Sequence, residues 1–172
     1  WKLDKLFSPR FEANCPVWTG DKNSKLLVWA EQGVGDQIMY SGLIPDLSKI
    51  CLDLIVQVEP RLISLFDRSL GDKCTFYPNN KSLSVKYDKH IAMGSLCQYL
   101  RNDEKDFESS RYGFLKDDEI KTANIKKDLL ALTPSNNKIC GISWRSVSPK
   151  TGIHKTMSLK FFIETLALEG YT

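Results

Sequence analysis

A strand, a turn and the start of a helix follow one another in the stretch Lys25-Leu26-Leu27-Val28-Trp29-Ala30-Glu31-Gln32-Gly33-Val34-Gly35-Asp36. It opens with the continuous apolar run 25–30, which is typical of a strand buried on both faces of a parallel sheet. A glycine-containing turn comes next, and Asp36 then begins a helical pattern that Pro45 should interrupt or kink. The order of buried strand, turn and helix predicts one unit of a parallel α/β fold.

The same alternation continues along the chain. Further strands are expected at 52–58, 75–77 and 89–93, and short helices at 61–66 and 96–100. After a polar, loop-like segment at 102–110, the spacing of apolar residues predicts a longer helix over 117–132. We therefore predict an α/β fold with a Rossmann-like parallel sheet and right-handed crossovers.

We expect three parts in the chain. Residues 23–135 form a Rossmann-like domain, and residues 1–22 form an irregular, aromatic and proline-containing arm on the surface of that domain. The polar segment Thr133-Pro134-Ser135-Asn136-Asn137 is the best linker candidate. A second α/β unit then begins, with a strand at 138–144 and a helix at about 158–168, so that 138–172 reads as the start of a truncated second Rossmann-like domain.

Composition excludes several classes of protein. The 172 residues are 42% hydrophobic and 26% charged, with a net charge of +3, which is ordinary globular composition. No run approaches the roughly 18 apolar residues that span a bilayer, and no cluster of basic residues indicates nucleic-acid binding. The five cysteines are odd in number and far apart, which predicts reduced thiols and a cytoplasmic location.

Asp36 is the first candidate for chemistry. A helix N-terminus favours the ionised carboxylate, which suits a general base, but Asp is also a preferred N-cap, and the two roles are compatible. The Gly33-x-Gly35 pattern with Glu59 after the next strand also raises dinucleotide binding. Two features argue against it: Ile38 stands where the third glycine belongs, and Asp36 would repel a pyrophosphate. His90, in an apolar strand, is expected to be structural.

Two segments carry a resemblance to a known family. The stretch 26–39, preceded by Pro16-Val17-Trp18-Thr19-Gly20, resembles the glycosyltransferase-like domain that follows tetratricopeptide repeats in many bacterial proteins. That domain is related to the family 9 glycosyltransferases, the lipopolysaccharide heptosyltransferases. The segments 142–146 and 155–159 are similar to the first strand and loop of the carboxyl-terminal half of this family, whereas about 60–135 matches only in its strand–helix order.

The resemblance implies a GT-B architecture, in which two Rossmann-like halves face each other across a cleft. The first half would bind a sugar or protein acceptor, and the second would bind a nucleotide-sugar donor. Asp36 would be the catalytic base, with substrate contacts from Gln32, Gly33, Gly35, Ser95 and Gln98, and donor-phosphate contacts from Arg145 and Lys155. No metal or other cofactor is expected, because the chain has no D-x-D motif and GT-B enzymes of this type are expected to work without one.

The ends of the chain suggest a piece of a longer polypeptide, since it begins at Trp1 and stops after a helical pattern. We expect the isolated chain to be inactive, because most of the donor half is missing, and to associate with itself through an apolar face of helix 161–168. The alternative function belongs to another class. Because tetratricopeptide arrays are protein-binding scaffolds, the domain would then be a non-catalytic ligand-binding or scaffolding module.

Overall fold

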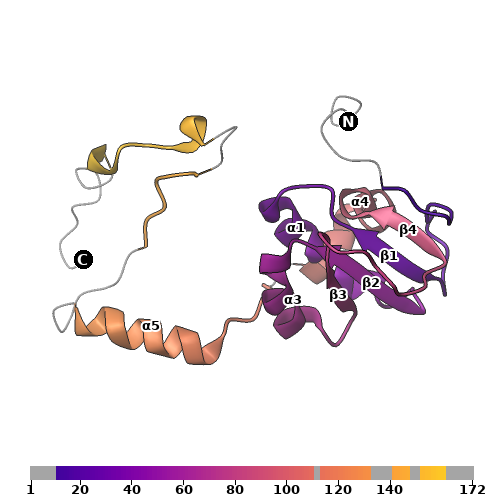
Figure 1. Cartoon of the computed structure of the whole chain (residues 1–172), viewed down its shortest axis with the longest axis horizontal. Helices are drawn as coiled ribbons and strands as arrows, with labels where there is room; N and C mark the ends of the chain where they lie inside the picture. The colour runs from indigo at the N-terminus through magenta and orange to yellow at the C-terminus, as the bar shows by residue number, and fades with distance from the viewer. Residues whose placement is uncertain (1–10, 111–112, 133–140, 148–151, 162–172) are drawn as a thin grey trace. The chain divides into compact units, whose positions relative to one another are not determined.

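A computed structural model describes residues 11–110, 113–132, 141–147 and 152–161 of the chain (Figure 1). The chain divides into two compact units, residues 1–117 and residues 118–172. The first unit contains a four-stranded sheet of order β3-β2-β1-β4, in which every strand pair is parallel. Its strands are β1 Lys25–Trp29, β2 Asp53–Val58, β3 Thr75–Pro78 and β4 Lys89–Ala92. The predicted Rossmann-like α/β fold is confirmed.

Helices follow the strands as the sequence predicts. After β1 come α1 Val34–Ser41 and α2 Ile44–Leu47, and the break between them precedes Pro45, which lies in the first turn of α2. After β2 come the 3₁₀ turn η2 Pro60–Leu62 and α3 Ile63–Leu70, and after β4 come η3 Met93–Leu96 and α4 Cys97–Leu100. The polar segment expected as a loop contains a 3₁₀ helix, η4 Glu104–Ser110.

One face of the sheet packs against these helices. Alternate strand residues, among them Val28, Val56 and Ile91, join Ile44, Phe66 and others in one hydrophobic core. Strand and helix residues are buried in the same cluster, which explains why continuous apolar runs predict these buried strands correctly.

The opposite face of the sheet carries Leu27, Ile55, Trp29 and Gln57. Leu27 and Ile55 are buried, and Trp29 and Gln57 are register partners at the carboxyl ends of β1 and β2. The connection from β3 to β4, residues 79–88, contains no helix. Gln57 Nε2 donates to the Lys81 carbonyl at 3.4 Å, which places this connection against the second face. This face is therefore covered by irregular chain, and it keeps room for polar side chains.

The described part of the arm is irregular as predicted, but it is not merely laid on the surface. The Trp18 side chain is fully buried, donates from Nε1 to the Asp21 carbonyl at 2.7 Å, and meets Tyr99 edge to face. The Trp18 N–H donates to the His90 carbonyl, and the His90 N–H donates to the Pro16 carbonyl. Burial of so large an apolar side chain makes the arm part of the hydrophobic core.

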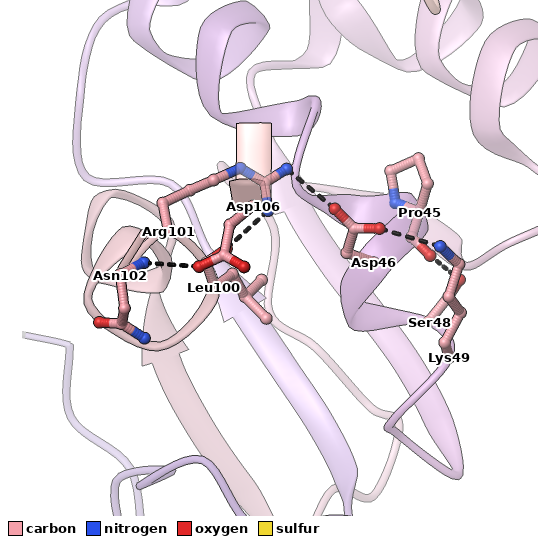
Figure 2. A network of polar contacts seen from close by, with 8 residues as sticks. All are labelled: Pro45, Asp46, Ser48, Lys49, Leu100, Arg101, Asn102 and Asp106. Atoms are coloured by element: carbon pink, nitrogen blue, oxygen red, sulfur yellow. Dashed lines mark hydrogen bonds and ion pairs between the residues drawn. The ribbon is translucent and has the colours of Figure 1, made fainter. Parts of the chain in front are cut away.

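A buried arginine ties α2 to the end of α4 (Figure 2). The Arg101 side chain is 5% exposed, and its Nη2 lies 2.8 Å from Asp46 Oδ2, while Lys49 Nζ lies 2.9 Å from Asp46 Oδ1. Burial raises the pKa of Asp46, but the hydrogen bonds from Lys49 and Arg101 outweigh it and leave that pKa below its usual value. Asp106 accepts the N–H groups of Asn102 and Asp103. The network fixes the segment that follows β4.

The second unit holds α5 Glu119–Ala131, whose first turn is capped by the Asp118 carboxylate accepting the Lys121 N–H at 3.1 Å. The sequence predicts this helix within the domain 23–135, whereas contacts group it with the second unit. Residues 141–147 have no regular structure, so the strand predicted at 138–144 is wrong in its described part, where no neighbouring strand supplies hydrogen bonds. Of the helix predicted at about 158–168, residues 159–161 are helical, Ser158 is not, and 162–168 lie outside the described residues.

Three further observations concern the described residues alone. Cys15, Cys51, Cys74 and Cys97 are free thiols, as predicted, whereas Cys140 lies outside the description. No described helix has the length and apolar character to cross a membrane. Within the same ranges, no group of three or more His, Cys, Asp or Glu side chains is placed to hold a metal ion.

Candidate functional site

The order of the strands places the reversal point of the sheet between β1 and β4. In open α/β sheets, ligands bind outside the carboxyl ends of the strands at the point where the strand order reverses. Here the chain runs outward from β1 to β2 and β3, and then returns to the other side of β1 as β4. The two strand ends are joined directly, because Glu31 Oε1 accepts the Gly94 N–H at 3.1 Å. The turn after β1 and the turn after β4 therefore form one site.

Asp36 lies in the first turn of α1, which follows β1. The N-cap of α1 is Gly33, and the helix starts at Val34, so the expectation of Asp36 as the N-cap is wrong by three positions. Its carboxylate folds back over the turn, since a methyl group added at Gly33 would lie 3.5 Å from Asp36 Oδ2. This position keeps the carboxylate at the turn that follows β1.

The other predicted acceptor contacts lie around the same edge. Gln32 and Gly33 form the turn after β1, and Gly35 is the second residue of α1, with open space where a side chain would be. Ser95 is in η3, which packs against α1, whereas Gln98 lies further on in α4 and is exposed. The structure thus brings together every predicted acceptor position except Gln98.

Gln37 is a positioning residue that the sequence analysis missed. Its side chain is 3% exposed, and it donates from Nε2 to the Gln32 carbonyl at 2.8 Å. Its Oε1 accepts the Glu59 N–H at 2.9 Å. One amide therefore fixes the turn after β1 to the end of β2, because it donates through its nitrogen and accepts through its oxygen.

A pocket of about 580 Å³ opens over the second face of the sheet at the same edge. Trp29 and Gln57 form its floor from neighbouring strands, and Glu31, Gln32 and Asn79 follow β1 and β3. Phe11, from the arm, stacks on Trp29 with ring centroids 5.0 Å apart and planes 13° from parallel. The volume is in the usual range of about 300–1,000 Å³ for ligand pockets.

His90 supports the aromatic wall of this pocket. Trp29 Nε1 donates to His90 Nδ1 at 3.2 Å, and the Phe11 ring lies 5.3 Å from the imidazole. Since Nδ1 accepts a hydrogen bond, the neutral ring carries its proton on Nε2. Burial lowers the pKa of His90, which favours the same neutral form. The expected structural role of His90 is confirmed.

Glu31 has an unmet hydrogen-bonding capacity. Its Oε1 bonds to Gly94, but Oε2 is buried and has no donor among the described residues. Buried polar atoms in folded proteins are nearly always paired, so an orphaned carboxylate oxygen beside a pocket needs an explanation. Glu59, the candidate for a dinucleotide ribose, is instead engaged by Arg61 Nε at 2.8 Å. Its engagement is a further reason against dinucleotide binding.

The two predicted donor-side residues lie in the second unit. Arg145 lines an open cavity of about 650 Å³ together with Ser146, Gly152 and Thr156. The segments around this cavity are joined by hydrogen bonds from the Met157 N–H to the Trp144 carbonyl and from the Ser146 N–H to Thr156 Oγ1. Lys155 closes the 3₁₀ turn η5 Ile153–Lys155 and does not line the cavity. Trp144, which precedes Arg145, is 37% exposed.

Comparison with known proteins gives one distant relative. The chain is 27% identical over 158 residues to Protein FlbA of Caulobacter vibrioides, an alignment that covers 81% of this chain and 26% of FlbA. The chain thus spans about a quarter of the length of this curated relative. No family model matches the chain, and no solved structure matches it.

Proposed function

We propose that the chain belongs to a GT-B glycosyltransferase-like protein and supplies the acceptor side of its site. The observation that carries this proposal is the meeting of the Glu31–Asp36 turn with the turn after β4 at the point where the strand order reverses. A carboxylate, an open glycine and several polar side chains lie together there, which suits the recognition of a hydroxyl-bearing acceptor.

In this reaction Asp36 accepts the proton of an acceptor hydroxyl while that oxygen attacks the anomeric carbon of a nucleotide-sugar. The new C–O bond forms as the bond from the anomeric carbon to the diphosphate breaks, and the nucleoside diphosphate leaves with the electron pair. Arg145 and Lys155 are proposed to neutralise its charge, as cations do for leaving phosphates. General-base catalysis contributes about 10²- to 10⁴-fold to such a step.

The test is the substitution Asp36→Asn in the full-length parent protein, assayed for nucleotide release from UDP-, GDP- and ADP-activated sugars. We expect turnover to fall at least about 100-fold, because Asn keeps the shape of Asp and removes the base. The thermal midpoint should be nearly unchanged, because Asn is isosteric with Asp at this position in the first turn of α1. Asp53→Asn, at the amino end of β2 and exposed, is the matched control and should keep full activity.

A second variant separates binding from folding. Gly35→Ala adds a methyl group where the structure has open space, within a helix where Ala is favoured over Gly by about 1 kcal/mol. We expect the free protein to be no less stable, but acceptor binding to weaken if the backbone approaches the ligand there. Full turnover in Asp36→Asn, or no transfer by the parent with any of these donors, would replace this proposal with the non-catalytic binding module.

A further inference from the structure

The pocket over the second face of the sheet has a definite chemical character. One wall is the stacked pair of Phe11 and Trp29, which offers rigid apolar area. The remaining lining comes largely from the amides of Gln32, Gln57 and Asn79, which both donate and accept hydrogen bonds. An apolar wall with a few placed polar groups is the usual composition of a small-molecule site.

The charged side chains among the described residues that line this pocket are all acidic. Glu12 and Glu31 both line it, and the described lining contains neither lysine nor arginine. Lys81, the nearby basic residue, contacts Gln57 through its main-chain oxygen. A carboxylate or phosphate on a ligand would therefore meet repulsion without compensation, whereas an uncharged ligand would not.

Within the part of the chain that the structure describes, the unpaired Oε2 of Glu31 lacks a hydrogen-bond donor, which a ligand could supply. The other oxygen is already satisfied by the Gly94 N–H, so the carboxylate is held in place and cannot turn Oε2 to solvent without losing that bond. Oε2 has almost no accessible surface in this structure, so a ligand hydroxyl, a donor of the right kind, reaches it once a neighbouring pocket side chain moves aside.

We infer that this pocket binds an uncharged sugar, with the aromatic pair against the ring and Glu31 accepting from its hydroxyl groups. The role of this sugar rests on the proposed function, in which it is the acceptor of the transfer reaction. Glu31 and Gln32 belong both to the pocket and to the turn that leads to Asp36, so the two parts of the site are continuous along the chain.

The inference is tested by saturation-transfer NMR on the 172-residue chain with matched neutral and anionic probes. The neutral probes are the methyl glycosides of glucose, galactose, mannose and N-acetylglucosamine, and the anionic probe is methyl glucuronide. Methyl glucoside and methyl glucuronide differ only in the carboxylate. We expect at least one neutral glycoside to bind, and the glucuronide to bind about tenfold more weakly than the glucoside or not at all.

Substitutions then assign the binding to the pocket. Glu31→Gln keeps the shape but removes the charge, so it should weaken the neutral glycoside about tenfold and reduce the preference for glucoside over glucuronide. Trp29→Ala should abolish binding, whereas Trp29→Phe, which also loses the bond to His90, should retain part of it. Asp53→Asn is the matched carboxylate control at the opposite end of the sheet and should change nothing.

The outcomes distinguish this inference from the proposed function. Absence of binding by every neutral glycoside, equal binding of the glucuronide, or an unchanged Glu31→Gln variant would overturn the inference. Glycoside binding with full turnover in the Asp36→Asn parent would overturn the proposed function and leave the sugar site standing. Transfer that depends on Asp36 but uses only anionic acceptors would overturn the inference and leave the proposed function standing.

Discussion

His90 shows how a single hydrogen bond fixes a protonation state. Its Nδ1 accepts from Trp29 Nε1, and a proton on that nitrogen would remove the acceptor. Burial already lowers the pKa of His90 below the ordinary value of 6.5. Protonation of the imidazole is therefore opposed both by burial and by the loss of a bond to the pocket wall.

We predict that His90 makes the stability of the first unit depend on pH. The unfolded chain binds the proton more tightly than the folded chain, so the contribution is fully present above pH 6.5 and is lost as the pH falls from there towards the folded pKa. The free energy of unfolding in urea, measured from about pH 8 to about pH 5, should fall by at most about 1.4 kcal/mol per pH unit from this group.

The control for this prediction is His90→Asn, which keeps an acceptor for the Trp29 indole but does not titrate. Its stability should be flatter over the same pH range, and the indole N–H resonance of Trp29 should no longer shift with pH. Equal slopes in the two proteins would show that His90 does not control this dependence.

The roles of single residues were the hardest feature to predict from the sequence. Asp36 stood out because a carboxylate after a glycine turn has an obvious chemistry, yet its helix position was wrong by three residues. Glu31 and Gln37 lie in the same stretch and were not recognised as structural, because a buried Glu or Gln looks like any exposed one in a sequence. Only the neighbouring N–H and carbonyl groups identify their roles.

At the level of elements, Gln37 is predicted to hold α1, the turn before it and the end of β2 together. Gln37→Ala removes the partners of the Gln32 carbonyl and the Glu59 N–H, and we expect it to lower the free energy of unfolding by about 1–3 kcal/mol. Urea denaturation measures the loss. Gln37→Glu keeps the acceptor but places a buried carboxylate oxygen against the Gln32 carbonyl, so it should not restore the lost stability; a change below about 0.5 kcal/mol in Gln37→Ala would contradict the bridging role.

Strands and helices of the first unit were predictable for physical reasons. Continuous apolar runs gave β1 and β2 to within one residue at each end, because both faces of these strands are covered. Pro45 marked the break between α1 and α2 correctly. The strand expected at 138–144 had a similar apolar pattern, but a strand exists only with a hydrogen-bonded neighbour, which the pattern does not report.

For the whole molecule, the arm is predicted to be a determinant of stability. Trp18→Ala removes a fully buried side chain together with its hydrogen bond to Asp21, and we expect the free energy of unfolding to fall by about 3–5 kcal/mol. Guanidinium denaturation followed by circular dichroism measures it. Trp18→Phe should cost less, because it keeps much of the contact with Tyr99. A decrease in the free energy of unfolding below about 1 kcal/mol would show that the arm is a surface segment and not part of the core.

The division of the chain could not be predicted from composition. The polar linker candidate at 133–137 was the strongest signal of its kind in the sequence, whereas contacts divide the chain between residues 117 and 118. The sequence assigned α5 to the first domain, whereas contacts group it with residues 118–172. An amphipathic pattern indicates that a helix has a face to bury and says nothing of which partner buries it.

The contact between the arm and β4 limits how this sheet can grow. β4 would otherwise present a row of free N–H and carbonyl groups, which is a template for a strand from another chain. The hydrogen bonds of His90 with Pro16 and Trp18 occupy part of that row, and at the far side β3 ends in Pro78, which has no N–H to offer. Both edge strands are thus partly blocked from pairing with a strand of another chain. Copies of this chain that associate should therefore do so through surfaces other than the edges of the sheet.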